Sequence, residues 1–320
     1  MSKLSDKFVL AAANGFLYAA NHRRVRHYRR LFGRRPNIAN PQTYSERMLW
    51  RKLVDHNPQF VVFCDKLATK EFMRRRCPNL PQAKVRWVGQ DAEAIPDEVL
   101  RGDVFVKASH GCDFNHRIRG GKYDRAVLRE KTRRWLGSVY GVGSGQWAYS
   151  QVKPQLFVEE AVGDAEGDLI EFDVRASNGI PLLGSIVGKC KTPAQWRVYV
   201  DPAGVPTRGM EDLEDSPLKS LPSELALEGP YRRAVQFAKT LSAGLDYARF
   251  DFMWNGRELF GGEITVYPAA GNTEPANAAA NALTLSGWDL RHSHFAKVQH
   301  NGWKKCYADA LKRRWTEQNP

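Results

Sequence analysis

The segment 248–265 constrains the fold more than any other part of this chain. Two runs of alternating apolar and polar residues flank Asn255-Gly256, the dipeptide that most readily supplies the positive φ angles of a tight hairpin turn. Asp251 and Glu263 lie at similar distances from that turn, so strand pairing predicts that their carboxylates meet. Two carboxylates among apolar residues repel each other unless a cation lies between them. The hairpin therefore predicts a divalent metal site and, with it, a phosphorylated ligand.

Charge and cysteine content narrow the functional class. The chain has 320 residues, 42% of them hydrophobic, which suffices for a sizeable core in two or three lobes. Its net charge is +13, but residues 1–36 hold nine lysines and arginines against the single acid Asp6. The five cysteines form no Cys-x-x-Cys pair, and no recognised nucleic-acid motif accompanies the charge. These features favour a cytoplasmic protein and make nucleic acid an unlikely partner.

The basic N-terminal arm admits two interpretations. The arginine-rich segment 21–32 follows an apolar stretch and predicts a cationic amphipathic helix. Such a helix can lie on anionic lipid at the inner face of the membrane, or grip an acidic polymer. It can equally pack its apolar side on the body of the protein and leave a solvated basic face. The apolar stretch 8–20 is too short to span a bilayer.

The rest of the sequence mixes predicted helices and strands, which indicates an α+β or α/β fold. Helices are expected over 43–54, 60–76, 125–136, 231–243 and 303–316, and strands over 85–88, 104–108, 156–162 and 170–176. Thr43 and Glu46 have the spacing of a capping box. The expected division is a basic arm (1–40), a segment of helices and strands (41–100), a lobe with glycine loop and hinge (101–165), a lobe with the metal-binding hairpin (166–300) and a C-terminal helix (301–320).

Two glycine-rich segments resemble phosphate-binding motifs without meeting their spacing. In 141–145 the third glycine comes too early for a dinucleotide-binding turn, so we expect a loop. The segment 184–190 is one residue short of a P-loop and has Cys190 where a magnesium-binding hydroxyl is needed. Neither segment predicts a nucleotide site.

Groups suited to phosphate binding occur elsewhere. Lys66 lies in the N-terminal half of a predicted helix, which favours anions through its free N–H groups and its dipole. Lys107 ends a predicted strand directly before a loop that contains Gly111, so an ammonium group and loop amides can converge on the same phosphates.

Groups suited to a nucleoside follow in order along the chain. An apolar strand ends at Glu159, Glu160 and Val162, where main-chain groups can contact an adenine edge. Glu171 begins the next strand and can accept hydrogen bonds from ribose hydroxyls. Each of these residues has an ordinary structural explanation when taken singly, and it is their order that predicts ATP.

This order resembles the ATP-grasp superfamily, and in particular its D-alanyl-D-alanine ligase branch. The resemblance implies a nucleotide clamped between two α+β lobes, with ATP and Mg²⁺ as cofactors. It implies a catalytic arginine at Arg249 and magnesium carboxylates at Asp251 and Glu263. Thr265 stands where the family has an asparagine ligand. We also assign Lys189 to the phosphates.

A closer resemblance extends over most of the chain. The segments that carry it are 40–47, 107–111, 147–149, 153–154 and 262–268, which are similar to the TupA-like ATP-grasp proteins of teichuronopeptide and polysaccharide biosynthesis. The resemblance implies a ligase that joins a carboxylate to an amine through an acyl phosphate. It further implies a cell-envelope setting, with an amino acid or peptide and an acidic, carboxylated glycan as substrates. Lys107 and Arg249 are the expected catalytic residues.

Substrate contacts are expected at His110, Lys191, Arg197 and Thr265. Two other functions remain open at this point. One is an ATP-grasp-type kinase that phosphorylates a sugar or glycan hydroxyl. The other is a non-enzymatic protein that binds polyanions through the basic arm.

Overall fold

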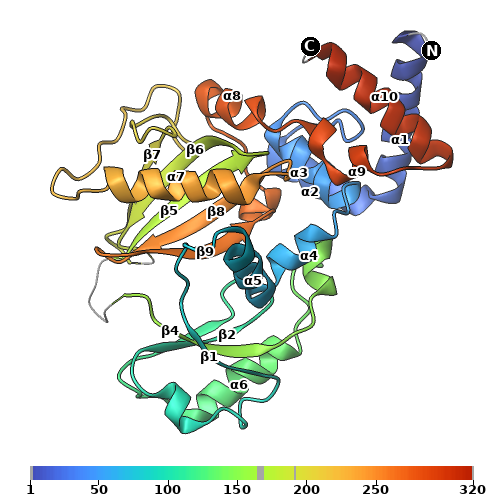
Figure 1. Ribbon diagram of the computed structural model, residues 1–320. Coiled ribbons are helices and arrows are strands. Elements are labelled where there is room, and N and C mark those ends of the chain that lie inside the picture. Colours follow the sequence, from blue (N-terminus) through green and yellow to red (C-terminus); the bar gives the residue numbers. More distant parts are fainter. Residues whose placement is uncertain (1–2, 164–168, 191, 319–320) are drawn as a thin grey trace.

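A computed structural model describes residues 3–163, 169–190 and 192–318. These residues form two antiparallel sheets with helices packed around them, which confirms the α+β class (Figure 1). The smaller sheet has the strand order β1-β4-β2-β3, with β1 at Val85–Gly89, β2 at Val104–Ala108, β3 at Asn115–Ile118 and β4 at Leu156–Glu160. The larger sheet has the order β7-β6-β5-β8-β9, with β5 at Ile170–Ser177, β6 at Ile180–Gly188, β7 at Trp196–Val200, β8 at Ala248–Trp254 and β9 at Leu259–Thr265.

The larger sheet has one apolar and one polar face. Because side chains alternate along a strand, Phe172 and Val174 of β5 lie on one face and are buried in the main core. Helix α7 (Glu228–Ser242) packs on that face (Figure 1). Glu171, Asp173 and Arg175 lie on the opposite face, here named the polar face.

The smaller sheet has its own core between the strands and helix α6 (Arg125–Leu136), and Figure 1 shows this helix along one face of the sheet. Val104 and Val106 of β2 point into this core together with Leu128 and Trp135 of the helix. The segment 141–145 is a loop, as expected, and 184–188 is part of strand β6 rather than a phosphate loop.

The single helix expected over 60–76 is wrong, because the chain breaks at Asp65. Asp65 is extended, with φ −103° and ψ 113°, and separates α4 (Gln59–Cys64) from α5 (Lys66–Arg76). Its carboxylate caps the second helix by accepting hydrogen bonds from the backbone N–H groups of Leu67 (2.9 Å) and Ala68 (3.3 Å). The break creates a new helix N-terminus at Lys66, and Figure 1 shows α4 and α5 between the two sheets.

The remaining helices cover the outer parts of the larger lobe. Helix α3 (Tyr44–Leu53) begins with the predicted capping box of Thr43 and Glu46. Trp50 and Trp288 are fully buried in the second core beside α3. The other helical segments are α8 (Ala278–Ser286), α9 (His294–Lys297), α10 (Gly302–Gln318) and the short 3₁₀ helices Asp97–Leu100, Trp147–Gln151, Pro268–Gly271 and Leu290–His292.

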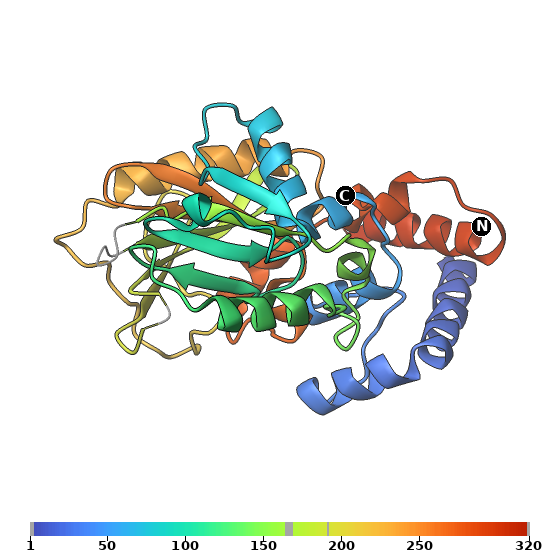
Figure 2. The same cartoon turned by 90° about the horizontal axis from the view of Figure 1, so that it is seen from below.

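The N-terminal arm consists of α1 (Lys3–Ala20) and α2 (His22–Phe32), which project from the two sheets in Figure 2. Helix α1 lies alongside α10, and Asp6 forms an ion pair with Arg313 at 2.7 Å. The buried Tyr28 of α2 places its hydroxyl 2.7 Å from Ser45 Oγ. The apolar side of the arm therefore packs on the body, while four arginines of α2 are exposed, namely Arg23, Arg26, Arg29 and Arg30.

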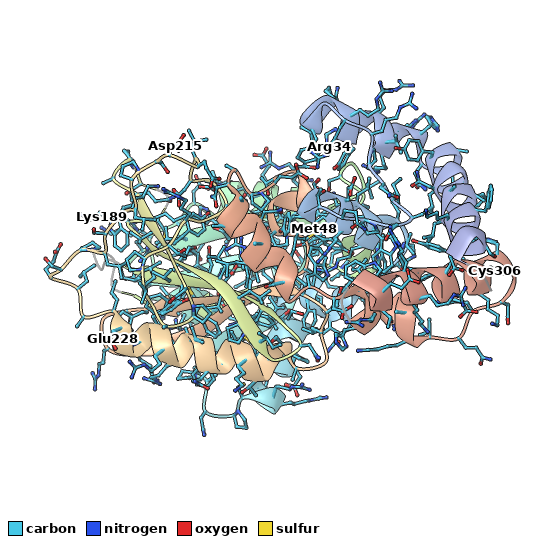
Figure 3. All side chains as sticks on the ribbon, turned by 90° about the horizontal axis from the view of Figure 1, so that it is seen from above. Arg34, Met48, Lys189, Asp215, Glu228 and Cys306 are labelled. Atoms are coloured by element: carbon cyan, nitrogen blue, oxygen red, sulfur yellow. The ribbon has the colours of Figure 1, made fainter. Side chains whose placement is uncertain are left out.

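The arm is also joined to the body at its end. Arg34, labelled in Figure 3, pairs with Glu274 in the segment before α8. The helices of the described residues include none long and apolar enough to cross a membrane.

Candidate nucleotide and metal site

Strands β8 and β9 form the predicted hairpin, but its turn has four residues rather than the expected two. Oδ1 of Asn255 accepts hydrogen bonds from the backbone N–H groups of Arg257 (3.0 Å) and Glu258 (2.8 Å). These side-chain hydrogen bonds replace the backbone hydrogen bonds of a tight turn. Asn255 Nδ2 also donates to the carbonyl oxygen of Val162 at 3.0 Å. The hairpin is thereby tied to the segment that follows β4.

A β-bulge positions the two hairpin carboxylates. The register of β8 against β9 shifts at Asp251, so this residue lies opposite both Gly262 and Glu263. A Cβ atom at Gly262 would lie 2.7 Å from the carbonyl oxygen of Asp251. Glycine at this position is therefore required for the close approach of the strands.

Asp251 is held by Arg249 on the same strand. Arg249 Nε lies 2.7 Å from Oδ1, and Nη2 lies 2.6 Å from Oδ2, so the pair is bidentate. Burial raises the pKa of Asp251 to about 7; Arg249 lowers it, while Asp173 and Glu263 raise it further. Thr265 Oγ1 lies 3.5 Å from Asp251 Oδ2. The hairpin thus presents an acidic group whose charge is only partly compensated.

Asp173 is a candidate that the sequence reasoning missed. It pairs directly across from Asp251 in the register of β5 and β8. Its Oδ2 accepts a hydrogen bond from Ser185 Oγ at 2.9 Å and lies 3.4 Å from Arg197 Nη1. The alternation Glu171-x-Asp173-x-Arg175 on one strand was the signal available in the sequence. Arg197, expected to contact substrate, therefore joins the acidic pair on the polar face.

Lys66 connects the start of α5 to the glycine loop. Its backbone N–H donates to the carbonyl oxygen of Ser109 at 2.8 Å, and its ammonium group donates to the carbonyl of Gly111. Burial lowers the pKa of Lys66, an effect that nearby Glu263 opposes and Lys107 reinforces. Lys66 thus lies within electrostatic reach of both the hairpin and the second predicted lysine.

Lys107 and Lys70 share one buried carboxylate. Glu159 Oε2 lies 2.9 Å from Lys70 Nζ, and Oε1 lies 2.5 Å from Lys107 Nζ. Burial alone would raise the pKa of Glu159, but the two ammonium groups outweigh it and the pKa is lowered. The side chain of Glu159 therefore positions two lysines, a role beyond the main-chain contact expected of it. Lys70 thereby joins the site.

The hinge residues after Glu159 use their side chains structurally. Glu160 Oε1 lies 3.1 Å from Arg86 Nε on β1. The Val162 carbonyl accepts the hydrogen bond from Asn255, so the hinge and the metal hairpin are in direct contact. Residues 164–168, which follow, lie outside the described part of the chain.

The glycine loop is shaped by Gly111 and anchored by His110. Gly111 has φ +78°, and a Cβ there would lie 2.7 Å from the ring of Phe114. His110 is 1% exposed, and its Nε2 lies 3.1 Å from the carbonyl oxygens of Trp135 and Ser138. The ring of His110 therefore faces the end of α6, and a substrate contact at this residue stays a prediction.

The remaining predicted residues lie at the start of β5 and just beyond the end of β6 in the larger sheet. Glu171 contacts the thiol of Cys190, whose pKa is raised to about 12 by burial first and by Glu171 second. Lys189 is exposed just beyond β6, with φ +51°, and Figure 3 shows it at the outer end of this sheet. Lys191 lies outside the described part.

The donor set suits a hard divalent cation that has further ligands from a bound phosphate. Within the described residues, no three His, Cys, Asp or Glu side chains form a complete metal site. In that part of the chain Glu263 is exposed and has no hydrogen bond or ion pair, so its oxygens are available. Asp251 is crowded by acids and can gain from a cation. These residues fit Mg²⁺, which is commonly held by one or two carboxylates plus substrate phosphates.

The fold and site together describe a two-sheet α+β protein with lysines and acids gathered between a glycine loop and a bulged hairpin. No protein-family model matches the chain, and no curated protein sequence does. Similar solved structures include D-alanine–D-alanine ligase from Bacillus anthracis, with 16% identity and a TM-score of 0.38 over 81% of this chain and 70% of that one. An L-amino acid ligase from Bacillus licheniformis has 14% identity and a TM-score of 0.39, over 78% of this chain and 50% of that one. Similarity of this extent assigns no activity to the chain.

Proposed function

We propose that this protein is an ATP- and Mg²⁺-dependent carboxylate–amine ligase of the ATP-grasp type. The observation that carries the proposal is the position of Lys66, which lies within electrostatic reach of both Lys107 and Glu263, on three separate elements of the fold. Ammonium groups complement phosphate oxygens, and carboxylates complement the metal that accompanies them. A nucleoside triphosphate with its cation satisfies both kinds of group at once.

The residues of this chain have separate tasks in that reaction. Lys66 and Lys107 neutralise phosphate oxygens. Mg²⁺, when bound, supplies charge neutralisation between phosphates, and Asp251 and Glu263 would hold it. Catalysis then consists of positioning and electrostatic stabilisation, and no protein nucleophile is needed.

The chemistry has two steps. A substrate carboxylate oxygen attacks the γ-phosphorus of ATP, ADP leaves, and an acyl phosphate forms. An amine then attacks the acyl carbon, the carbon–oxygen bond to phosphate breaks, and phosphate leaves as the amide forms. Arg249, already oriented by Asp251, stabilises the oxyanion of the second step.

We further propose an amino acid or peptide and an acidic, carboxylated glycan as substrates, in cell-envelope polysaccharide biosynthesis. The resemblance to TupA-like proteins and the exposed arginines of α2 support this part of the proposal. A basic face complements a polyanionic glycan, and also the anionic inner face of the membrane. A cytoplasmic location fits the use of ATP.

An ADP-release screen of amino acids against uronic-acid glycans, with hydroxylamine added, tests the proposal. Hydroxylamine converts an acyl phosphate to a hydroxamate and leaves a phosphate ester unchanged. The proposal predicts ADP release together with a hydroxamate. ADP release with a stable phosphate ester would instead identify a kinase. Absence of Mg²⁺-dependent nucleotide binding, with polyanion binding lost on deletion of residues 1–36, would identify a non-enzymatic protein.

A further inference from the structure

The polar face of the larger sheet orders its charged residues in successive pairs. Asp173 faces Asp251 across β5 and β8, and Arg175 faces Arg249 two residues further along. Two residues along a strand span about 7 Å. The acidic pair and the arginine pair are therefore neighbours on one surface.

Arg175 is a buried cation without an acceptor. It is 5% exposed, and its Nε and Nη1 are enclosed and form no hydrogen bond in the described residues. Arg51, which is also buried, shows how this fold can pair such a group. Arg51 has Asp246 at 2.8 Å and the carbonyl oxygen of Val266 at 2.8 Å. An uncompensated buried charge is costly, so Arg175 calls for an anion that the described chain does not supply.

Buried phenols complete the surroundings of Arg175. Tyr44, Tyr199 and Tyr247 are its closest electrostatic neighbours together with Arg249. The hydroxyls of all three tyrosines are enclosed; those of Tyr44 and Tyr247 interact with each other, and that of Tyr199 interacts with Arg197. Each hydroxyl can donate to an oxyanion. Arg175 and these tyrosines, named the Arg175 cluster, are thus a buried cation and three hydroxyl groups drawn from α3, β5, β7 and the residue before β8, with no anionic acceptor among them.

We infer that the Arg175 cluster binds a carboxylate of the substrate, next to the acidic pair of Asp173 and Asp251. A guanidinium matches a carboxylate with two parallel hydrogen bonds, and phenols can fill the remaining lone pairs. The inference rests on the proposed function for the identity of the neighbouring phosphate site. Arg175 then serves as a substrate-positioning residue. The proposed sites for the nucleotide, the metal and the substrate anion follow one another along the polar face.

The test measures the Tm of the full chain with glucuronate and with neutral glucose as the matched probe. A separate measurement uses Mg²⁺ and a non-hydrolysable ATP analogue. Glucuronate should raise the Tm of the wild type and glucose should not. Arg175→Met should need roughly tenfold or more glucuronate for the same rise, as expected for loss of a charge-assisted contact. Its rise with the ATP analogue should be unchanged. Tyr247→Phe should weaken the glucuronate response without abolishing it.

The Tm measured without ligand distinguishes a binding role of Arg175 from a structural role. Arg175→Met should unfold at or above the wild-type Tm, because it removes an uncompensated buried charge. Arg51→Met, the matched control with a paired arginine, should unfold roughly 5 °C or more below it. A large loss of Tm in Arg175→Met would instead indicate a structural role.

Other results would overturn the inference. These are an undiminished glucuronate response in Arg175→Met, an equal response to glucose, or a response through Arg175 to inorganic phosphate alone. If the wild type responds to glucuronate through Arg175 but not to the ATP analogue, the anion site stands and the proposed function fails.

Discussion

Arg249 grips both carboxylate oxygens of Asp251, at 2.7 Å and 2.6 Å, from two residues earlier on the same strand. The pair links the two steps of the proposed reaction. Asp251 is the proposed metal ligand for phosphoryl transfer, and Arg249 is the proposed stabiliser of the oxyanion in amide formation. Burial and neighbouring acids raise the pKa of Asp251, which indicates that Arg249 alone does not satisfy it. A bound cation would complete the compensation.

Asp251→Asn should abolish turnover and leave the fold intact. The amide keeps the shape of the side chain but loses the charge that holds the metal, so ADP release should fall roughly 100-fold or more. Asp309→Asn is the matched control, since Asp309 pairs with Lys305 on the exposed side of α10. Unchanged ADP release in Asp251→Asn, with the same substrates, would remove the hairpin from the mechanism.

Lys107→Met should weaken binding of Mg²⁺–ATP roughly tenfold or more, because an ammonium contact to phosphate is lost. Stability should change little, since Glu159 keeps its ion pair with Lys70 at 2.9 Å. Calorimetric titration measures the affinity. Lys122→Met, at an exposed lysine, should bind the nucleotide as the wild type does. Equal affinities of the two variants would show that Lys107 does not reach the phosphates.

Gly262→Ala should reduce both stability and activity. The added Cβ would lie 2.7 Å from the Asp251 carbonyl oxygen, so the bulge must open and the carboxylate must move. Gly143→Ala is the control, because nothing lies within 4 Å of its added Cβ. Thermal unfolding and ADP release should separate the two variants, and wild-type behaviour of Gly262→Ala would refute the role of the bulge.

The pH dependence of stability should contain a contribution from Asp55. Burial, with the nearby charge of Asp246, raises its pKa to about 7, although Oδ1 accepts a hydrogen bond from the Phe295 N–H at 2.7 Å. The folded protein thus retains a proton that the unfolded chain releases near pH 4. Between these values the folded state binds more protons, so raising the pH lowers the free energy of unfolding through this group.

Asp55→Asn should remove that contribution. Relative to the variant, the wild type should lose up to about 4 kcal/mol between pH 4 and pH 7, at about 1.4 kcal/mol for each pKa unit. Denaturant unfolding at several pH values measures the difference. Parallel pH profiles of the two proteins would show that Asp55 has an ordinary pKa.

Local signals predicted the local features of this protein. The capping box of Thr43 and Glu46 depends on residues three apart, and it forms as expected. The strand before Gly111 and the hairpin around Asn255 were likewise recognisable from short patterns. The break at Asp65 was not, because the apolar residues before it and the good helix formers after it continue one helical pattern.

Features that depend on distant pairing could not be predicted. Asp173 and Arg175 gain their importance from the register of β5 against β8, which joins segments about 75 residues apart. His110 is buried because the end of α6 supplies two carbonyl oxygens, which no pattern around the histidine reveals. The role of Glu159 as the shared partner of two lysines depends on α5 and β2 approaching the same strand.

The most direct test of the central claim is calorimetric titration of a non-hydrolysable ATP analogue into the full chain with and without Mg²⁺, for the wild type and Glu263→Gln. Glu263 is exposed and unpaired in the described residues, so its substitution should not disturb the fold. The account predicts binding that requires Mg²⁺ and is weakened roughly tenfold or more by Glu263→Gln. Binding that is unaffected both by removal of Mg²⁺ and by Glu263→Gln, or no binding at all, would contradict it.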